Sequence, residues 1–335
     1  MTNALTLTTV PAPLAQADAL AAFGDFLRLR VAHGDASPAT IRTYRGHVAT
    51  FVEWCAAQGI NPAQATEGDL EAYRAALVAA GLKRDTVALK LAAVRRFFEA
   101  ATWRGLRADN PAAGLKAPRN RTSREERIKF LPAGYIDRLL ATVPGDDAQA
   151  RRDRALLLLF ALQGPRVAEL AALNLGDLDL DGDPPMARVI GKGDKARTLY
   201  LVTTDRAALV AWLQARADII AEMHTERPGP FDDALFVTLH SNQEGDAGRR
   251  MTARSIRHHV DAALAAAGLK RQGVSCHSLR HSYGTWSAYA GAPVASISAR
   301  MGHSSIDTTG TYVKVADAMK QNPAAYLERW AGLAS

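Results

Sequence analysis

Four side chains that can bind or attack a phosphate group lie close together between Val274 and Val315. They are His277, Arg280, His303 and Tyr312. An arginine presents a planar fork of donors that matches two phosphate oxygens, and a histidine can donate, accept or transfer a proton near neutral pH. The hydroxyl of a tyrosine, whose unperturbed pKa is about 10, becomes a nucleophile once its proton is removed. Together these side chains predict chemistry on a phosphate ester.

The spacing of these residues predicts that helices and turns bring them to one site. His277 and Arg280 are three positions apart, so on a helix they share a face. A Gly-Ala-Pro run breaks that helix, and its proline, Pro293, suits the start of a second short helix. His303 follows the glycine that closes this second helix, and Tyr312 comes nine positions later.

The residues around these positions resemble the catalytic signature of the tyrosine recombinases, the phage-integrase family that includes Xer-like enzymes. HSLRH at 277–281 matches the pattern HxLRH, and GHSSIDTTGTY at 302–312 places a histidine nine residues before a tyrosine. The resemblance implies a site-specific DNA recombinase that cuts and rejoins strands through a 3′-phosphotyrosyl intermediate and a Holliday junction. It further implies a homo-tetramer on paired double-stranded target sites, with or without a partner recombinase, and no metal, ATP or other cofactor.

Two further motifs extend this resemblance. GPRVAEL at 164–170 is similar to the family's GLRxSEL, which carries the first catalytic arginine, here Arg166, and the proline before it restricts the turn. GKGDKAR at 191–197 is similar to a family motif whose lysine corresponds to Lys192, with Lys195 as a competing candidate. The candidate catalytic residues are therefore Arg166, Lys192, His277, Arg280, His303 and Tyr312.

The resemblance implies that two arginines bind the phosphate. Arg166 and Arg280 would clamp the non-bridging oxygens and neutralise the charge that grows in the transition state. Loss of one such donor typically slows a reaction about 100- to 1000-fold. Glu169, three residues after Arg166, would either orient that arginine or brace the fold.

The other candidates carry the nucleophile and the protons in this scheme. Tyr312 would attack the phosphorus, and Lys192 would protonate the leaving oxygen. His277 would accept the tyrosine proton or hold a phosphate oxygen, and His303 would donate to the same phosphate. These roles follow from the matching motif positions, and the residue types permit them.

The region at 15–115 predicts four amphipathic helices, an arrangement that resembles the SAM-like core-binding domain of the same family. Apolar residues recur there at helical spacing. The Ser-Pro pair at 37–38 predicts the start of the second helix. Thr66 with Asp69 resembles a capping box before the third, and Asp85 is expected to cap the fourth.

The remainder predicts a mixed, mostly α-helical catalytic domain with a small β-hairpin or sheet, so the fold class is mainly α. A buried helix at 153–163 is expected to end at Gly164. Two short strands are expected around the Gly-Asp pair at 193–194. Asp205 and Thr252 are expected to cap two later helices.

The expected organisation comprises a flexible tail at 1–14, a core DNA-binding domain at 15–115, a basic linker at 116–130, a catalytic domain at 131–316 and a C-terminal helix at 317–335. The last helix is amphipathic, with Met319, Tyr326, Leu327 and Trp330 as its apolar residues. Such a helix could pack on its own domain. The resemblance implies instead that it is donated to a neighbouring protomer, which is the outcome we expect.

Positive charge predicts a polyanionic partner. The formal net charge is +7 and the isoelectric point is near 9.5. Basic side chains fall beside the apolar stripes of the N-terminal helices, in the linker and at the start of one C-terminal helix. We interpret them as phosphate contacts that position a DNA duplex, although a solvated face would show the same pattern. The predicted DNA-binding residues are Arg42, Arg45, Lys83, Arg84, Lys90, Arg95, Arg96, Arg119, Arg121, Arg254 and Arg257.

The cysteine content and the N-terminal residues predict the cellular compartment. The two cysteines, Cys55 and Cys276, are far apart and lack metal-binding spacing, which favours a reducing cytoplasm without a disulfide framework. The N-terminal residues lack a basic segment followed by a long apolar core, so no signal peptide is expected. No apolar run reaches the length of about 18 residues that indicates a membrane span.

Three other functions fit part of the sequence. A type IB topoisomerase runs the same tyrosine chemistry but relaxes DNA alone, and the N-terminal helical domain fits a recombinase better. A metal-dependent nuclease could use His277 and His281, one helical turn apart, as a zinc pair. Its third ligand would have to be His303 or a distant carboxylate, because no aspartate or glutamate occurs at 274–306. A DNA-binding regulator would need neither the tyrosine nor the paired arginines.

Overall fold

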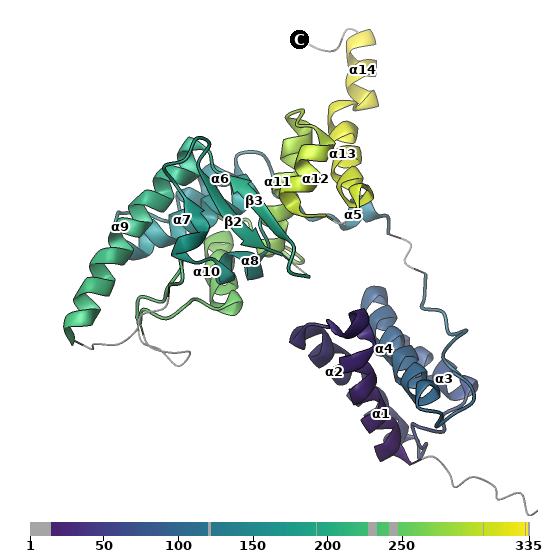
Figure 1. The fold of residues 1–335 in the computed structure, drawn as a ribbon. Coiled ribbons are helices and arrows are strands. Elements are labelled where there is room, and N and C mark those ends of the chain that lie inside the picture. The colour runs from purple at the N-terminus through teal and green to yellow at the C-terminus, as the bar shows by residue number, and fades with distance from the viewer. Residues whose placement is uncertain are drawn as a thin grey trace, which may run out of the picture. The chain divides into compact units, whose positions relative to one another are not determined.

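The computed structural model describes residues 15–119, 122–191, 193–226, 233–240, 247–303, 305–331 and 333. The chain forms two compact units, residues 1–121 and 122–335, each with its own hydrophobic core (Figure 1). The prediction of a mainly α fold with a small β-sheet is confirmed. Among the described residues, no helix combines the length and the apolar character that crossing a membrane requires.

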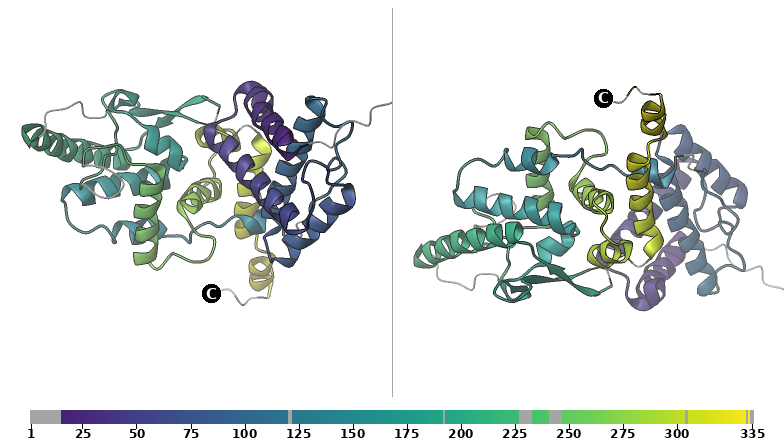
Figure 2. Two further views of the ribbon diagram at one scale, coloured as in Figure 1. Left: turned by 90° about the horizontal axis from the view of Figure 1, so that it is seen from below. Right: turned by 90° about the horizontal axis from the view of Figure 1, so that it is seen from above.

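The first unit is a bundle of helices. Its elements are α1 (Gln16–Leu29), the 3-10 turn η1 (Val31–Gly34), α2 (Pro38–Ala57), α3 (Glu67–Ala79) and α4 (Arg84–Trp103). Helix α4 packs against α1, α2 and α3, and Figure 2 shows these purple to blue helices from two directions. Phe51 lies in the core, with edge-to-face contacts to Tyr73, Phe97 and Phe98 at centroid distances of 5.1, 6.3 and 6.1 Å. These aromatic contacts join α2, α3 and α4.

Local capping signals explain most helix starts in this unit. The Ser-Pro pair at 37–38 begins α2 as predicted. Thr66 and Asp69 form the predicted capping box, with reciprocal hydrogen bonds of 3.2 and 2.8 Å. The prediction that Asp85 caps the fourth helix is wrong, because α4 has Lys83 as its N-cap. Asp85 lies in the first turn instead, where its negative charge complements the helix dipole.

The second unit contains most of the chain and all of the described strands. Its elements are α5 (Arg124–Arg127), α6 (Tyr135–Leu140), α7 (Ala148–Gln163), α8 (Val167–Ala172), the 3-10 turn η2 (Leu175–Asp177), β1 (Leu178–Asp179), β2 (Met186–Ile190), β3 (Ala196–Tyr200), α9 (Thr203–Glu226), α10 (Ala253–Ala266), α11 (Cys276–Tyr289), α12 (Val294–Met301), α13 (Ile306–Lys320) and α14 (Pro323–Trp330). The antiparallel sheet has the order β1-β2-β3. Strands β2 and β3 form the predicted hairpin, in which Gly193 and Asp194 have φ angles of 71° and 51°.

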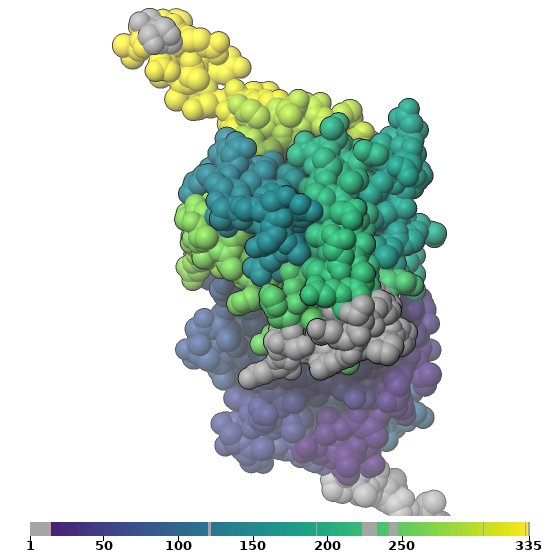
Figure 3. Space-filling model, turned by 90° about the vertical axis from the view of Figure 1, so that its left-hand side faces the viewer, coloured from purple at the N-terminus to yellow at the C-terminus, as the bar shows by residue number. Residues whose placement is uncertain are grey.

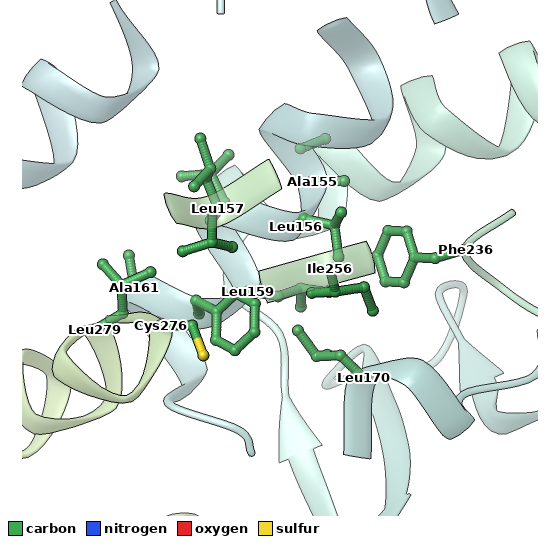
Figure 4. Packing of buried hydrophobic residues seen from close by; sticks show 14 of the residues in the cluster. Ala155, Leu156, Leu157, Leu159, Ala161, Leu170, Phe236, Ile256, Cys276 and Leu279 are labelled. Atoms are coloured by element: carbon green, nitrogen blue, oxygen red, sulfur yellow. The ribbon is translucent and has the colours of Figure 1, made fainter. Parts of the chain in front are cut away.

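The core of this unit surrounds α7. Leucines of α7 pack with Leu170 of α8, Ile256 of α10 and Leu279 of α11, as Figure 4 shows. Gly164 is the C-cap of α7 and has a left-handed φ of 59°. A Cβ at Gly164 would lie 2.5 Å from the ring of Tyr283 on α11, so only glycine fits here. This close contact holds the chain that precedes the first candidate arginine against α11.

Two predicted helix starts in the second unit have different outcomes. Thr252 caps α10 as predicted and accepts a backbone hydrogen bond at 3.0 Å. Asp205 does not cap α9, which already begins at Thr203. Its carboxylate lies in the first turn and accepts from the backbone N–H of Val202 at 2.7 Å and from the side chain of Gln163 at 2.6 Å. Asp205 therefore joins the start of α9 to the end of α7.

The C-terminal segment and the linker differ from their expected outlines. Helix α13 continues to Lys320, and a separate helix, α14, begins at Pro323 with Asn322 as its cap, whereas the sequence predicted one helix there. Figure 3 shows α14, in yellow, projecting from the rest of the second unit. Within the segment expected to be a basic linker, Arg124–Arg127 forms α5, which packs against α13.

Candidate active site

Arg280 is the most deeply buried of the candidate residues that the structure describes. It lies near the start of α11, and it is 2% exposed. Its guanidinium donates to the carbonyl of Gly164 at 2.6 Å and to the carbonyl of Met301. These carbonyls end α7 and α12, so they fix the plane of the guanidinium and leave further donors for an anion. Burial, with the charge of the nearby Arg166, lowers the pKa of Arg280 to about 10, so it stays cationic at neutral pH.

Arg166 reaches the same site from the turn between α7 and α8. It is the N-cap residue of α8, and its guanidinium donates to the carbonyl of Gly302 at 3.1 Å. Gly302 directly follows Met301, so two successive carbonyls at the end of α12 hold the two guanidinium groups. Two like charges at one place repel each other unless an anion binds between them. The pair can therefore bind an anion.

Glu169 holds Arg166 in place and is itself held by a residue that the sequence analysis missed, Arg197. Glu169 is 3% exposed and accepts from the backbone N–H and the guanidinium of Arg166 at 2.6 and 2.8 Å. Arg197 of β3 makes a bidentate contact to the same carboxylate at 2.7 and 2.6 Å, and it donates to the carbonyl of Arg300 at 2.7 Å. Burial opposes ionisation of Glu169, but the hydrogen bonds and charge of the two arginines hold its pKa below its ordinary value. The signal for Arg197 was the final arginine of the GKGDKAR motif.

Tyr312 lies in the middle of α13 with its ring between α11 and the turn that carries His303. It is only 4% exposed. A Cβ at Gly284 of α11 would lie 2.9 Å from this ring, so glycine allows the close approach of α13. His303 stacks on the ring with a centroid distance of 6.0 Å and an interplanar angle of 17°. The Nδ1 atom of His303 is 2.8 Å from the hydroxyl of Thr309, which fixes the imidazole.

The hydroxyl of Tyr312 contacts a second residue that the sequence analysis did not assign to the reaction, His281. The Nδ1 atom of His281 lies 2.9 Å from the phenolic oxygen. His277, one turn earlier on α11, is exposed, and its ring meets that of His281 at 4.5 Å with an interplanar angle of 76°. The sequence could show that His277 and His281 share a face, but their partner on α13 depends on helix packing. Among the described residues, no three His, Cys, Asp or Glu side chains form a group that could hold a metal.

Burial and the arginine charges together set the protonation states in the site. Burial, followed by neighbouring positive groups, lowers the pKa of both His281 and His303 to about 4, and it also lowers the pKa of His277. Burial raises the pKa of Tyr312, although Arg280 and Arg166 act in the opposite direction. At neutral pH the structure therefore holds neutral His281 and His303 and a protonated phenol beside two cationic arginines.

A cleft of about 720 Å³ opens beside Arg166 and His303. Its lining includes Arg166, Arg197, His303 and Lys195. Lys192, the favoured candidate for the general acid, lies outside the described residues, but its neighbours Gly191 and Gly193 both line the cleft. The hairpin thus presents its turn to the arginine-bearing site.

The predicted DNA-binding residues have different surroundings. Arg42, Arg45, Lys83, Arg84, Arg96, Arg119, Arg254 and Arg257 are exposed. Arg95 is half-buried and donates to the carbonyls of Ala112 and Leu115 at 3.2 and 2.7 Å, so it also supports the chain after α4. Lys90 is half-buried and contacts the hydroxyl of Thr50 at 3.1 Å. Arg121 lies outside the described residues.

Family models match parts of both units of the chain. Residues 129–319 match the model of the phage integrase family, and residues 23–105 match that of the phage integrase N-terminal SAM-like domain. The tyrosine recombinase XerC of Corynebacterium efficiens is 33% identical over 301 residues, which cover 89% of this chain and 87% of that protein.

Solved structures share the fold. The XerH site-specific recombinase bound to its palindromic difH substrate in a post-cleavage complex has a TM-score of 0.74 at 20% identity, covering 95% of this chain and 98% of that one. A lambda integrase tetramer bound to a Holliday junction has a TM-score of 0.65 at 14% identity, covering 90% and 78%. The two arginines, the stacked histidine and the buried tyrosine thus occur in a chain that belongs to the phage integrase family of tyrosine recombinases.

Proposed function

We propose that this protein is a site-specific DNA recombinase that cuts and rejoins strands through a 3′-phosphotyrosyl intermediate and a Holliday junction. The observation that carries the proposal is the position of Tyr312, a buried phenol stacked on His303, which directly follows the two carbonyls that hold Arg280 and Arg166. Three separate segments of the second unit contribute these residues. The relative named as tyrosine recombinase XerC further supports this function.

In the proposed reaction, the arginines bind the scissile phosphodiester. Arg280 is held rigidly by backbone carbonyls, and Arg166 is oriented by Glu169, so both donors are fixed before the substrate arrives. Preorganised donors need no reorganisation when the pentacovalent transition state gathers negative charge. A substrate phosphate would also relieve the repulsion between the two guanidinium groups.

Tyr312 then attacks the phosphorus, and the 5′-oxygen of the next nucleotide leaves. The Oη–P bond forms while the P–O5′ bond breaks, and Lys192 supplies the proton that the leaving oxygen needs. His277 accepts the proton that Tyr312 loses or holds a phosphate oxygen, and His303 donates to the same phosphate. Because the phosphotyrosyl bond retains the energy of the broken phosphodiester, a 5′-hydroxyl of another strand can reverse the step without ATP or a metal. Two rounds of exchange among four protomers would pass through a Holliday junction.

The first unit would supply affinity for the duplex. We propose that residues 15–115 form the core-binding domain, 116–130 the linker and 131–316 the catalytic domain. Basic residues on α2 and at the start of α4, including Arg42, Arg45 and the N-cap Lys83, would contact phosphates. The remaining predicted contacts would act in the same way. The buried thiols Cys55 and Cys276 are both free, which suits a reducing cytoplasm.

Helix α14 would join neighbouring protomers. Tyr326, Leu327 and Trp330 are 56%, 62% and 85% exposed in the single chain. An apolar groove of about 530 Å³ lies elsewhere on the second unit, and its lining includes Ile136 and Trp286. We propose that the groove of one protomer receives α14 of the next. This helix supports a recombinase over a topoisomerase that acts alone.

Covalent trapping in EDTA tests the proposed function. The purified protein would be incubated with fragmented DNA of its source genome in EDTA, denatured in detergent and digested. We expect DNA joined to the peptide that contains Tyr312, and sequencing of its 3′ ends would map the target. Adduct formation that depends on a divalent metal, or a modified residue other than Tyr312, would contradict the proposal.

Replacing Trp330 by glutamate is expected to weaken synapsis of two DNA sites at least tenfold. Burying an indole of about 200 Å² yields about 5 kcal/mol before the costs of association, and a carboxylate would have to be buried unpaired instead. Binding to a single half-site should not change. Gel-shift titration of one-site and two-site DNA would measure both, and Val210→Glu, at a 46% exposed position on α9, is the matched control. Wild-type cooperativity in Trp330→Glu would contradict donation of α14.

A further inference from the structure

His281 is the only described side chain that contacts the nucleophilic oxygen by a hydrogen bond in the structure. Its Nδ1 atom lies 2.9 Å from the phenolic oxygen, within the hydrogen-bonding distance expected between a general base and the atom whose proton it removes. The contact joins α11, which carries Arg280, to α13, which carries the nucleophile. The reacting oxygen is thus already paired with a basic nitrogen before any substrate binds.

The charges around His281 favour one direction for this hydrogen bond. His281 shares α11 with His277 and Arg280, faces Tyr312 on α13 and lies near His303. A neutral imidazole carries one proton, and with that proton on Nε2 the Nδ1 lone pair accepts from the phenol. The phenol is protonated at neutral pH because burial raises its pKa. In the opposite tautomer, Nδ1 carries the proton and donates it to the phenolic oxygen. Nδ1 then cannot accept the proton of the phenol.

We propose that His281, rather than His277, accepts the proton of Tyr312 during strand cleavage. This inference rests on the proposed function. The O–H bond of the phenol breaks as Nδ1–H forms, while Oη–P forms and P–O5′ breaks, and the leaving oxygen takes its proton from a separate acid. During rejoining, the imidazolium returns the same proton to the departing phenol.

Substrate binding would make this transfer easier. The phosphodiester brings a negative charge beside Arg166 and Arg280, which offsets the positive charges that disfavour protonation of His281. As the Oη–P bond forms, the phenol becomes steadily more acidic, so a weakly basic imidazole suffices late in the step. His277 is more exposed than His281, and it remains free for the other role considered above, contact with a phosphate oxygen.

His281→Asn separates proton transfer from positioning. The amide oxygen of asparagine can occupy the place of Nδ1 and accept the hydrogen bond, but it cannot take the proton at neutral pH. His281→Ala removes both abilities. Single-turnover adduct formation on a duplex with the mapped site would be measured for both variants and for His277→Asn, with His240→Asn as an exposed control. Thermal melting and half-site binding would report on folding.

We expect both His281 variants to form the adduct about 100-fold more slowly than the wild type, as for loss of a general base. Added imidazole should accelerate His281→Ala and leave the wild type unchanged. A substrate with sulfur in place of the bridging 5′-oxygen needs no acid for its leaving group. It should therefore restore Lys192→Ala but neither His281 variant.

Three results would overturn the inference. They are a wild-type rate for His281→Asn, recovery of the His281 variants on the sulfur substrate, or imidazole rescue confined to a His277 variant. Failure of the proposed function is distinguishable from these, because the wild-type protein would then form no adduct on any substrate. If His281→Ala does not fold, His281→Asn with its retained hydrogen bond still decides between base and positioning residue.

Discussion

Tyr312→Phe is expected to abolish the covalent adduct with DNA while leaving the fold and DNA binding close to wild type. Only the phenolic oxygen can form the bond to phosphorus, so its removal leaves no nucleophile in the site. The ring itself should stay in place, because it packs over Gly284 and stacks on His303. Loss of the hydrogen bond to His281 should cost about 1 kcal/mol, which would lower the melting temperature by roughly 2–4 °C.

A detergent-stable adduct on the mapped site, together with a thermal melt, measures this prediction. Tyr289→Phe is the matched control, because Tyr289 is 40% exposed at the end of α11. It should form adduct at the wild-type rate. An adduct that survives in Tyr312→Phe would assign the nucleophile to another residue. Loss of the adduct together with loss of half-site binding would show that the substitution had damaged the fold.

Arg280→Ala is expected to slow adduct formation about 100- to 1000-fold, because it removes a preorganised donor to the non-bridging oxygens. It should also lower the free energy of unfolding by a few kcal/mol. The carbonyls of Gly164 and Met301 would lose their donor, and each buried unpaired polar group costs about 1–3 kcal/mol. Arg280→Lys keeps the charge but not the fork, so we expect a smaller loss of rate.

A neutral methylphosphonate at the scissile position separates the catalytic loss from the structural one. Without the charge on the non-bridging oxygens, Arg280 accelerates adduct formation less in the wild type. The difference in rate between the wild type and Arg280→Ala should therefore be smaller. Arg151→Ala, which removes a surface arginine paired with Asp146, is the control for loss of a positive charge. An equal deficit on the charged and neutral substrates would mean that Arg280 only supports the fold.

Local signals in the sequence were enough to predict most of the elements that position the site. The capping box at Thr66 and Asp69, the left-handed Gly164 and the hairpin turn at 193–194 each depend on residues within a few positions. The error at Asp85 was also local, because an acidic residue suits either the cap or the first turn. The strand β1 has two residues, too few for any periodicity to show.

The contacts that join distant segments could not be predicted from the sequence in the same way. Glu169 and Arg197 are 28 positions apart and meet only because β2, the partner strand of β3, packs beside α8. His281 and Tyr312 are 31 positions apart, and their contact depends on how closely α11 and α13 pack. In both cases the residue types were visible in a motif, but the partner was not. The break between α13 and α14 did have a signal, the Asn-Pro pair at 322–323, which the expected single helix overlooked.

Because Gly284 has no side chain, the position of the attacking oxygen of Tyr312 depends on how closely α13 approaches α11. Since the ring of Tyr312 rests on the backbone of α11, its depth is set by the separation of two helix axes and not by a choice among rotamers. Arg280 is the fifth residue of the same helix, α11. The attacking oxygen and the guanidinium of Arg280 are therefore both positioned by α11, so a shift of this helix would move them together.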